Sequence, residues 1–287
     1  MDSIFHSRFV FMMQAKFPSN LWNYFYSILI LIICNSSVDA KELFGAFSSY
    51  HHDGRSIIVT TEQGQRLRLT PYGDFIVRVQ AARSKEDFFP DDRYEMVESH
   101  QWQGALSAVE DSQEVVMTIG KPTTFSIKIK KESVRLEFVD EENKKILLSQ
   151  KDGIWWNGDT IQSSFTADQS EHFTGLGHGY FGRELKLDLR GEVVHRNYGT
   201  QHGQQAPLIV PFYLSSKGYG IFLNSTFPNT FNFGNEGKYE FSIEGDGRMD
   251  YFVILGPDFR DILDRYTQLT GRPRFFPESA LGLALSD

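Results

Sequence analysis

The sequence predicts an all-β protein. Short runs rich in Ile, Val, Leu and Phe recur along the chain, and turn-forming Gly, Pro, Asn and Asp residues separate them. Several runs alternate apolar and polar residues, as at 125–130, where Phe125, Ile127 and Ile129 share one face. This period of two is typical of an antiparallel sheet with one dry and one wet face. Only residues 258–270 carry a convincing helical period, so we expect a β-sandwich or barrel with one C-terminal helix.

The strands begin after residue 41. The first three expected strands, 56–60, 66–70 and 75–79, are separated by turn residues at 63–64 and 71–74. Further strands are expected at 125–130, 134–138, 145–148, 185–189, 239–243 and 251–255. Between the two groups, residues 83–100 are charged and irregular, which predicts a loop whose carboxylates face water.

Residues 207–225 predict a β-hairpin in the core. Two apolar runs, 208–214 and 219–223, flank the connection 215–218, which contains Gly218. The runs are continuous rather than alternating, and such strands are usually covered on both faces.

The predicted helix has clear ends. Asp258 and Asp261 can accept hydrogen bonds from free amides at its start, while Gly271 and Pro273 end it. One face carries the apolar residues, which we expect to lie against the sandwich: Phe259, Ile262, Leu263, Tyr266 and Leu269.

Residues 1–40 predict a secretory signal peptide, with an uncleaved N-terminal anchor as the alternative. An apolar stretch at 21–34 follows Arg8 and Lys16 and precedes Val38-Asp39-Ala40, a suitable cleavage site. The stretch is short for a membrane span, which needs roughly 20 apolar residues. We therefore expect a secreted or periplasmic protein that starts at Lys41, with a sandwich domain at 41–257 and a last segment at 258–287.

Composition excludes several function classes. The 29 Lys and Arg residues against 37 Asp and Glu residues give a net charge of −8, so no basic surface for nucleic acid or anionic lipid is expected, and no membrane contact beyond the N-terminal signal. Cys34 is the only cysteine, so the mature chain would offer no disulfide, thiolate nucleophile or cysteine-bound metal. His195 and His202 lack an acidic partner at metal spacing, and we expect no metal and no cofactor.

Several motifs follow one another in a family order. They are Phe173-Thr-Gly-Leu-Gly177, Pro211-Phe212, Gly220-Ile-Phe-Leu-Asn-Ser225, Asp250-Tyr-Phe252 with Gly256-Pro257, Tyr266-Thr-Gln-Leu-Thr-Gly-Arg-Pro273 and Ala280-Leu-Gly282. This succession resembles the end of the N-terminal β-sandwich of glycoside hydrolase family 31, the α-glucosidase and α-xylosidase group. The resemblance implies a galactose-mutarotase-like β-super-sandwich. It also implies that 258–287 form a helix and the first strand of a (β/α)8 catalytic barrel that is absent from this chain.

The resemblance implies a glycosidase acting on α-linked terminal sugars, with its two catalytic carboxylates in the barrel. No catalytic residue is therefore expected in this chain, and we expect no hydrolysis by the chain alone. The acidic residues that it does contain in loop-like places are read as solvent-facing turn residues: Asp91, Asp92, Asp140, Glu141, Glu142, Glu244 and Asp246.

The resemblance also implies a loop that touches the bound sugar. It corresponds to residues 191–205, and the expected substrate-binding residues are Arg196, Asn197, Tyr198 and Gln201. Tyr198 offers a stacking face, and the polar residues can hydrogen-bond sugar hydroxyls in pairs. Many α-glucosidases have an Asp after an Asn or Arg here, whereas this chain has Tyr198, which leaves other α-linked sugars open. An ordinary polar surface loop is the alternative.

Two other functions stay open at this stage. A stand-alone carbohydrate-binding sandwich would explain the polar loop, but not the unpaired apolar run at 281–285. An aldose mutarotase would match the implied fold and would need a His and a Glu in one cleft. In each case the expected partner is a carbohydrate, an α-linked oligosaccharide if a barrel is joined.

Overall fold

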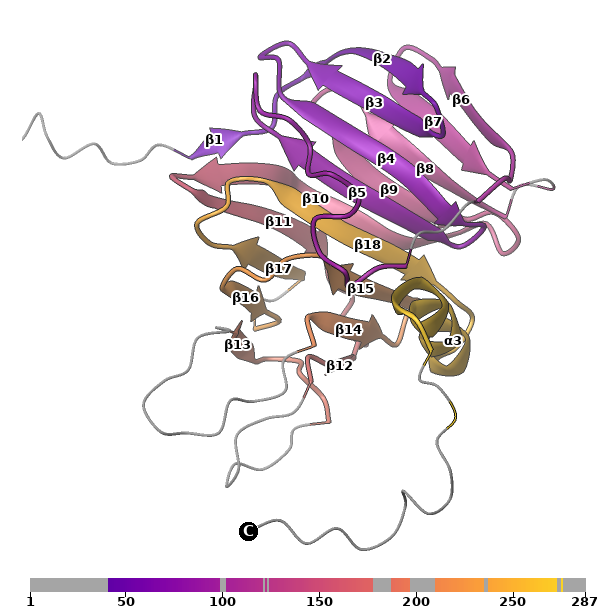
Figure 1. Ribbon diagram of the computed structural model, residues 1–287, viewed down its shortest axis with the longest axis vertical. Coiled ribbons are helices and arrows are strands. Elements are labelled where there is room, and N and C mark those ends of the chain that lie inside the picture. The colour runs from indigo at the N-terminus through magenta and orange to yellow at the C-terminus, as the bar shows by residue number, and fades with distance from the viewer. Residues whose placement is uncertain are drawn as a thin grey trace, which may run out of the picture. The chain divides into compact units, whose positions relative to one another are not determined.

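The computed structural model describes residues 41–98, 102–120, 122, 124–177, 187–196, 210–234, 237–272 and 275. Two antiparallel sheets pack face to face, and one helix lies at the edge of the described part (Figure 1). The elements are β1 (Glu42–Leu43), β2 (Phe47–Asp53), β3 (Ser56–Thr61), β4 (Arg66–Gly73), β5 (Ile76–Ala82), β6 (Leu106–Glu110), β7 (Glu114–Ile119), β8 (Phe125–Lys130), β9 (Arg135–Asp140), β10 (Lys145–Asn157), β11 (Thr160–Thr166), β12 (Phe173–Gly175), β13 (Val193–Arg196), β14 (Phe212–Ser215), β15 (Tyr219–Leu223), β16 (Asn229–Asn232), β17 (Lys238–Ile243), β18 (Met249–Leu255) and α3 (Phe259–Thr270).

The strand order places an N-terminal strand beside a C-terminal one. The ten-stranded sheet runs β13-β16-β17-β11-β10-β9-β8-β7-β6, with β1 paired to β10. The eight-stranded sheet runs β12-β14-β15-β18-β5-β4-β3-β2. Strand β18 lies between β15 and β5, with Tyr251 opposite Val79, so residues from both ends of the sequence build one sheet. The predicted all-β architecture is confirmed.

The main core fills the space between the sheets. The expected dry face at 125–130 is confirmed, because Phe125, Ile127 and Ile129 are fully buried there, whereas Ser126 on the expected wet face is buried as well. Aromatic rings fill the part near β12 to β17, where the rings of Phe173 and Phe233 stack with centroids 4.6 Å apart. Such ring pairs add to the free energy gained by burying apolar area.

The predicted hairpin is confirmed as β14 and β15, with Phe212 opposite Phe222. Every residue of both strands is buried. One face, with Tyr213, lies in the main core, and the other, with Phe212 and Phe222, belongs to a second apolar cluster that includes residues of α3. The rings of Phe212 and Tyr266 stack at 4.0 Å with an interplanar angle of 4°. The apolar runs are continuous because both faces are covered.

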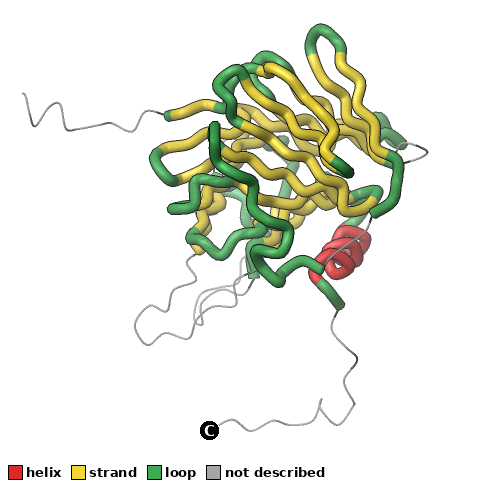
Figure 2. The backbone as a smooth tube through the Cα atoms, turned by 45° about the horizontal axis from the view of Figure 1, so that its top comes forward, coloured by secondary structure: helices red, strands yellow, loops and turns green. Residues whose placement is uncertain are grey.

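The helix has the predicted ends. The Asp258 carboxylate accepts a hydrogen bond from the Asp261 amide at 2.9 Å, and Gly271 follows the last turn with φ +89°. Ile262 and Leu269 are buried in the second apolar cluster, and the helix contacts β15 and β18, beside which it stands in Figure 2. The predicted apolar face is only partly used, because Phe259 and Leu263 remain 40% and 45% exposed.

The strand predicted at 185–189 is wrong over its described part. Residues 187–189 form no strand, and Leu187 is exposed. The Asp188 carboxylate accepts hydrogen bonds from the amides of Phe173 and Arg190, which turns the chain at this point. A side chain that bonds the backbone competes with a strand ladder, so the alternation of Leu and polar residues was misleading here.

Other predictions fall partly outside the described residues. The N-terminal signal at 1–40 and the apolar run at 281–285 both lie there, so the boundaries at 40 and 257 and the cellular location stay predictions. Among the residues that the structure does describe, no helix has the length and apolar character needed to cross a membrane.

Candidate functional site

The motif Phe173-Thr-Gly-Leu-Gly177 forms a tight turn at the end of β12. Gly175 and Leu176 both have positive φ, +127° and +65°. A Cβ on Gly175 would lie 2.5 Å from the Phe212 carbonyl oxygen, so only glycine fits against β14. The Leu176 amide donates to that same oxygen at 2.8 Å, and the Leu176 side chain is fully buried. Burial and this hydrogen bond hold a conformation that a leucine disfavours.

Arg196 ties this turn to the other sheet. It is the last residue of β13, opposite Asn229 of β16. Its Nε donates to the Leu176 carbonyl oxygen at 3.3 Å, and its Nη1 donates to the His195 carbonyl oxygen at 3.4 Å. We call the region around Gly175, Leu176 and Arg196 the corner.

The structure describes one of the four predicted sugar-binding residues. Arg196 lies at the corner, whereas Asn197, Tyr198 and Gln201 fall outside the described residues. The chain is described again from Val210, which packs against the outer apolar cluster that contains Phe212 and Ile262. Of the two described residues that flank 197–209, Arg196 thus lies on the edge strand of the ten-stranded sheet and Val210 beside the outer face of the eight-stranded sheet.

A buried carboxylate that sequence analysis missed ties the residues just before β12 to the hairpin. Glu171 is 1% exposed, and its Oε1 accepts hydrogen bonds from Ser215 Oγ and Tyr219 Oη, both at 2.5 Å. The Tyr219 hydroxyl also lies 2.8 Å from that of Tyr239. Burial raises the pKa of both tyrosines well above the usual value, and the nearby hydroxyl of Tyr213 and carboxylate of Glu171 add to the rise. These hydroxyls therefore remain neutral donors that anchor the start of β12 to the hairpin.

A second contact fixes the same stretch at the surface. His172 Nδ1 lies 2.6 Å from Asp188 Oδ2, and the other oxygen of Asp188 binds the amides of Phe173 and Arg190. Burial raises the pKa of Asp188, but the hydrogen bonds from His172 and the two amides outweigh it, so the pKa lies below its ordinary value. Among the described residues, no three His, Cys, Asp or Glu side chains gather as a metal site would require.

The comparisons with known proteins identify this sandwich. The profile of the glycosyl hydrolase 31 N-terminal galactose mutarotase-like domain matches residues 66–232. The chain belongs to glycoside hydrolase family 31. The all-β fold and the family resemblance predicted from the motifs are thus both confirmed.

The relatives of this family 31 chain include proteins named as an α-glucosidase and an α-xylosidase. It is 29% identical over 228 residues to α-glucosidase 2 of Bacillus thermoamyloliquefaciens, covering 76% of this chain and 26% of that protein. It is 34% identical over 139 residues to the α-xylosidase XylQ of Lactiplantibacillus pentosus, covering 46% and 18%. The chain therefore spans about a quarter or less of these relatives.

Solved structures share the fold. A dextranase variant of family 31 from Flavobacterium johnsoniae, complexed with isomaltotriose, superposes with a TM-score of 0.74 at 23% identity, covering 84% of this chain and 30% of that one. A cycloalternan-forming enzyme from Listeria monocytogenes, in complex with a pentasaccharide substrate, gives 0.68 at 23% identity, covering 83% and 23%.

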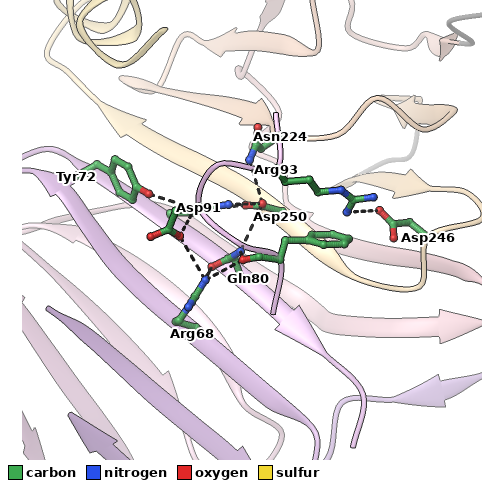
Figure 3. Close-up of polar contacts among 10 residues, drawn as sticks. Arg68, Tyr72, Gln80, Asp91, Arg93, Asn224, Asp246 and Asp250 are labelled. Carbon is green, nitrogen blue, oxygen red and sulfur yellow. Dashed lines mark hydrogen bonds and ion pairs between the residues drawn. The ribbon is translucent and has the colours of Figure 1, made fainter. Parts of the chain in front are cut away.

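On the outer face of the eight-stranded sheet, this family 31 sandwich buries an ion pair. Arg78 and Asp250 are both about 1% exposed, and the guanidinium donates to both carboxylate oxygens, at 2.8 and 2.7 Å. Asn224 and Gln80 also donate to Asp250, at 3.0 and 3.5 Å (Figure 3). Burial alone lowers the pKa of Arg78, but the hydrogen bonds and charge of Asp250 raise it above its ordinary value. The hydrogen bonds from Arg78, Asn224 and Gln80 thus satisfy the buried Asp250 carboxylate, as a buried ion pair requires.

The loop 83–98 is fastened over this pair, and one sequence interpretation is corrected there. The Asp91 side chain is 59% exposed, as expected for a solvent-facing residue, and its Oδ1 also accepts a hydrogen bond from Arg78 Nη1 at 2.7 Å. Asp246 was expected to be solvent-facing, but its side chain is 4% exposed and accepts from Arg93 at 3.0 Å (Figure 3). Burial raises the pKa of Asp246, and the charge of Arg93 opposes that rise. Arg93 and Asp246 are far apart in the sequence, so the local pattern around Asp246 did not indicate that it has a charged partner.

The other acidic cluster behaves as expected. Asp140 accepts from the amides of Glu142 and Asn143, at 3.0 and 3.1 Å, as a turn residue does. Glu141 accepts from Lys144 at 2.6 Å. These carboxylates therefore serve the turn after β9.

The close approach at the corner predicts a position-specific effect of alanine. Gly175→Ala should destabilise the chain by about 1–3 kcal/mol more than Gly54→Ala, because only the first Cβ meets backbone atoms. Gly54 is the matched control, since its φ is also positive, at +58°, with nothing within 4 Å of a new Cβ. Urea titrations of the two variants give the free energy of unfolding of each. Equal losses would contradict the steric account.

The buried pair predicts a second pattern. Arg78→Met should cost about 3–5 kcal/mol of unfolding free energy, because it leaves the Asp250 charge buried and unpaired. Arg78→Met combined with Asp250→Leu should recover much of that loss. Arg260→Met, at an exposed position of α3, is the control and should change stability by less than about 0.5 kcal/mol. A double variant as unstable as Arg78→Met would show that the charge imbalance is not the cause.

Proposed function

We propose that this chain is the N-terminal sandwich of an exported family 31 glycosidase that removes α-linked terminal sugars, and that segment 196–205 helps to recognise the sugar. Family membership and relatives that include an α-glucosidase and an α-xylosidase support the reaction class. In this proposal the catalytic carboxylates belong to a barrel outside this chain, joined after the helix α3.

The observation that carries the proposal is the corner. Arg196 is held against Leu176 by a hydrogen bond between the two sheets, so the segment that follows it has a rigid starting point. Its other end, at Val210, is packed beside the outer cluster near α3. In this proposal Asn197, Tyr198 and Gln201, which lie between these two described residues in the sequence, contact the sugar.

Three of the described carboxylates are engaged in contacts that suit a structural role. Retaining hydrolysis needs two carboxyl groups about 5–5.5 Å apart, one as nucleophile and one as acid and base. Asp91 and Asp246 are bound to Arg78 and Arg93, and Asp140 is bound to turn amides. Groups already committed to such partners are poorly placed to attack or protonate a sugar.

Sugar recognition by the segment would be weak without a barrel. Each exposed hydrogen bond contributes about 0.5–1.5 kcal/mol net, and one stacked ring contributes a similar amount. The entropy lost on ordering the segment can cancel this gain. The chain alone should therefore neither hydrolyse α-glycosides nor bind them tightly at this segment.

The expected result for export is a mature protein that begins at Lys41. The apolar stretch at 21–34 and the small residues at 38–40 are the reason. N-terminal sequencing of the protein from the native host identifies the first residue of the mature chain. Recovery of residues 21–34 in the membrane fraction would contradict cleavage and favour an anchor.

The loop prediction is tested with the chain joined to a family 31 barrel from its own reading frame or a relative. Tyr198→Ala and Asn197→Ala should each lower kcat/KM for an aryl α-glycoside roughly tenfold, which is about 1.4 kcal/mol of transition-state binding. Asn143→Ala, in the turn after β9, is the matched control and should have no effect.

Two outcomes would contradict the proposal. If both variants match the parent while folding normally, the segment is an ordinary surface loop. If the chain without a barrel turns over the aryl glycoside, or speeds the mutarotation of glucose in a polarimeter, the sandwich itself is catalytic.

A further inference from the structure

Strand β6 is an edge strand of the ten-stranded sheet, at the opposite edge from β13, which carries Arg196. Among the described residues it pairs only with β7, and Figure 1 shows it at the margin of the sheet. An edge strand leaves backbone amides and carbonyl groups without a strand partner, and these groups can pair with a strand of another chain. The β6 edge is therefore a candidate contact surface, separate from the corner.

The hydrogen bonds at both ends of β6 show which of its backbone groups are free. At one end the Gly120 amide donates to the Ala105 carbonyl oxygen at 3.0 Å. At the other end the Asp111 amide donates to the Glu114 carbonyl oxygen at 3.0 Å, and the register between these contacts is unbroken. In an antiparallel pair every second residue bonds the partner strand, so the odd-numbered residues of β6 face β7. The residues whose amide and carbonyl groups point away from β7 are Leu106, Ala108 and Glu110.

The β6 edge lacks the usual protection against pairing. Natural edge strands are often short, bulged or marked by Lys or Pro. The β6 sequence Leu-Ser-Ala-Val-Glu contains neither Lys nor Pro, and its register has no bulge. By contrast, β2 is bulged between Phe47 and Ser49, and β12 and β13 have only three and four residues. Val109 of β6 is 69% exposed, so its side chain is available to a partner strand.

We propose that β6 pairs with β6 of a second copy of this chain, in an antiparallel register centred on Ala108. In this register the free backbone groups of Ala108 bond those of the partner's Ala108, and Leu106 lies opposite the partner's Glu110. The two Glu110 carboxylates then lie at opposite ends of the pairing, whereas a parallel, in-register pairing would place them side by side. Glu110 is already bound to Lys131 at 2.5 Å, so its charge is compensated in each copy.

The same register covers the exposed valine. Val109 lies opposite the partner's Ser107, which makes the two Val109 side chains diagonal neighbours on one face of the joined sheet. Each valine is then partly removed from water by the other, which favours association. A second copy thus supplies both the backbone partners and an apolar partner for Val109, and no other chain has to be assumed.

The pairing involves few residues. It has five on each side, whereas a standard protein–protein interface has about 20–30. We therefore expect a reversible dimer that depends on protein concentration rather than an obligate one. This interface goes beyond the proposed function, because it needs neither a barrel nor segment 196–205.

Sedimentation velocity of the full chain, over roughly a hundredfold range of concentration, should show a monomer–dimer equilibrium. Ala108→Pro removes only an amide that points away from β7, and proline is tolerated at such edge positions. It should raise the dimer Kd at least about tenfold, as should Val109→Lys, which brings two ammonium groups near each other across the pairing. Val193→Lys is the matched control, because Val193 is also an exposed edge valine, at 51%, and it should leave Kd unchanged.

Hydrogen exchange of the backbone amides gives a second readout. At high concentration the amides of the three outward-facing residues should become protected. The amides of Ser107 and Val109, which bond β7, should be protected at every concentration.

Three results would overturn the proposal. The first is a chain that stays monomeric over the whole concentration range. The second is a dimer that both β6 variants leave intact, or that Val193→Lys disrupts equally. The third is protection of the outward-facing amides in the monomer, which would assign the edge to residues of this chain outside the described ranges.

Discussion

The structure depends on one constraint, the burial on both faces of four neighbouring strands of the eight-stranded sheet. Every residue of β5, β14, β15 and β18 is buried, between the main core on one side and α3 with loop 83–98 on the other. A sheet in this position cannot leave a charge unpaired, because a lone ion in a dry interior is very costly. The bidentate contact between Arg78 and Asp250 meets that requirement, and it gives loop 83–98 a charged anchor through Asp91.

The corner follows from the same constraint. Because β14 is fixed by burial on both sides, the Phe212 carbonyl oxygen has one position, and the turn at Gly175 must fit against it without a Cβ. Leu176 then presents its carbonyl oxygen to Arg196, which joins the edges of the two sheets. Burial of the central strands thus fixes the position of Arg196, the last described residue before the polar segment.

The features that depend on local sequence patterns were predicted correctly. The class, the hairpin and the helix ends at Asp258 and Gly271 follow from periodicity, turn residues and capping chemistry within a few residues. The ion pair could not be predicted, because Arg78 and Asp250 are 172 positions apart and only the strand order brings them together. The burial of Asp246 was missed for the same reason, and the family motifs, not residue spacing, pointed to the segment after Arg196.

The most direct measurement is a crystal structure of the chain joined to a family 31 barrel, with an α-linked oligosaccharide bound beside the barrel's catalytic carboxylates. The account predicts that the segment after Arg196 reaches that sugar, with Asn197 or Tyr198 within about 3.5 Å of it and the Arg196 contact to Leu176 retained. A sugar fully enclosed by barrel residues, with the segment turned away from it, would contradict the account.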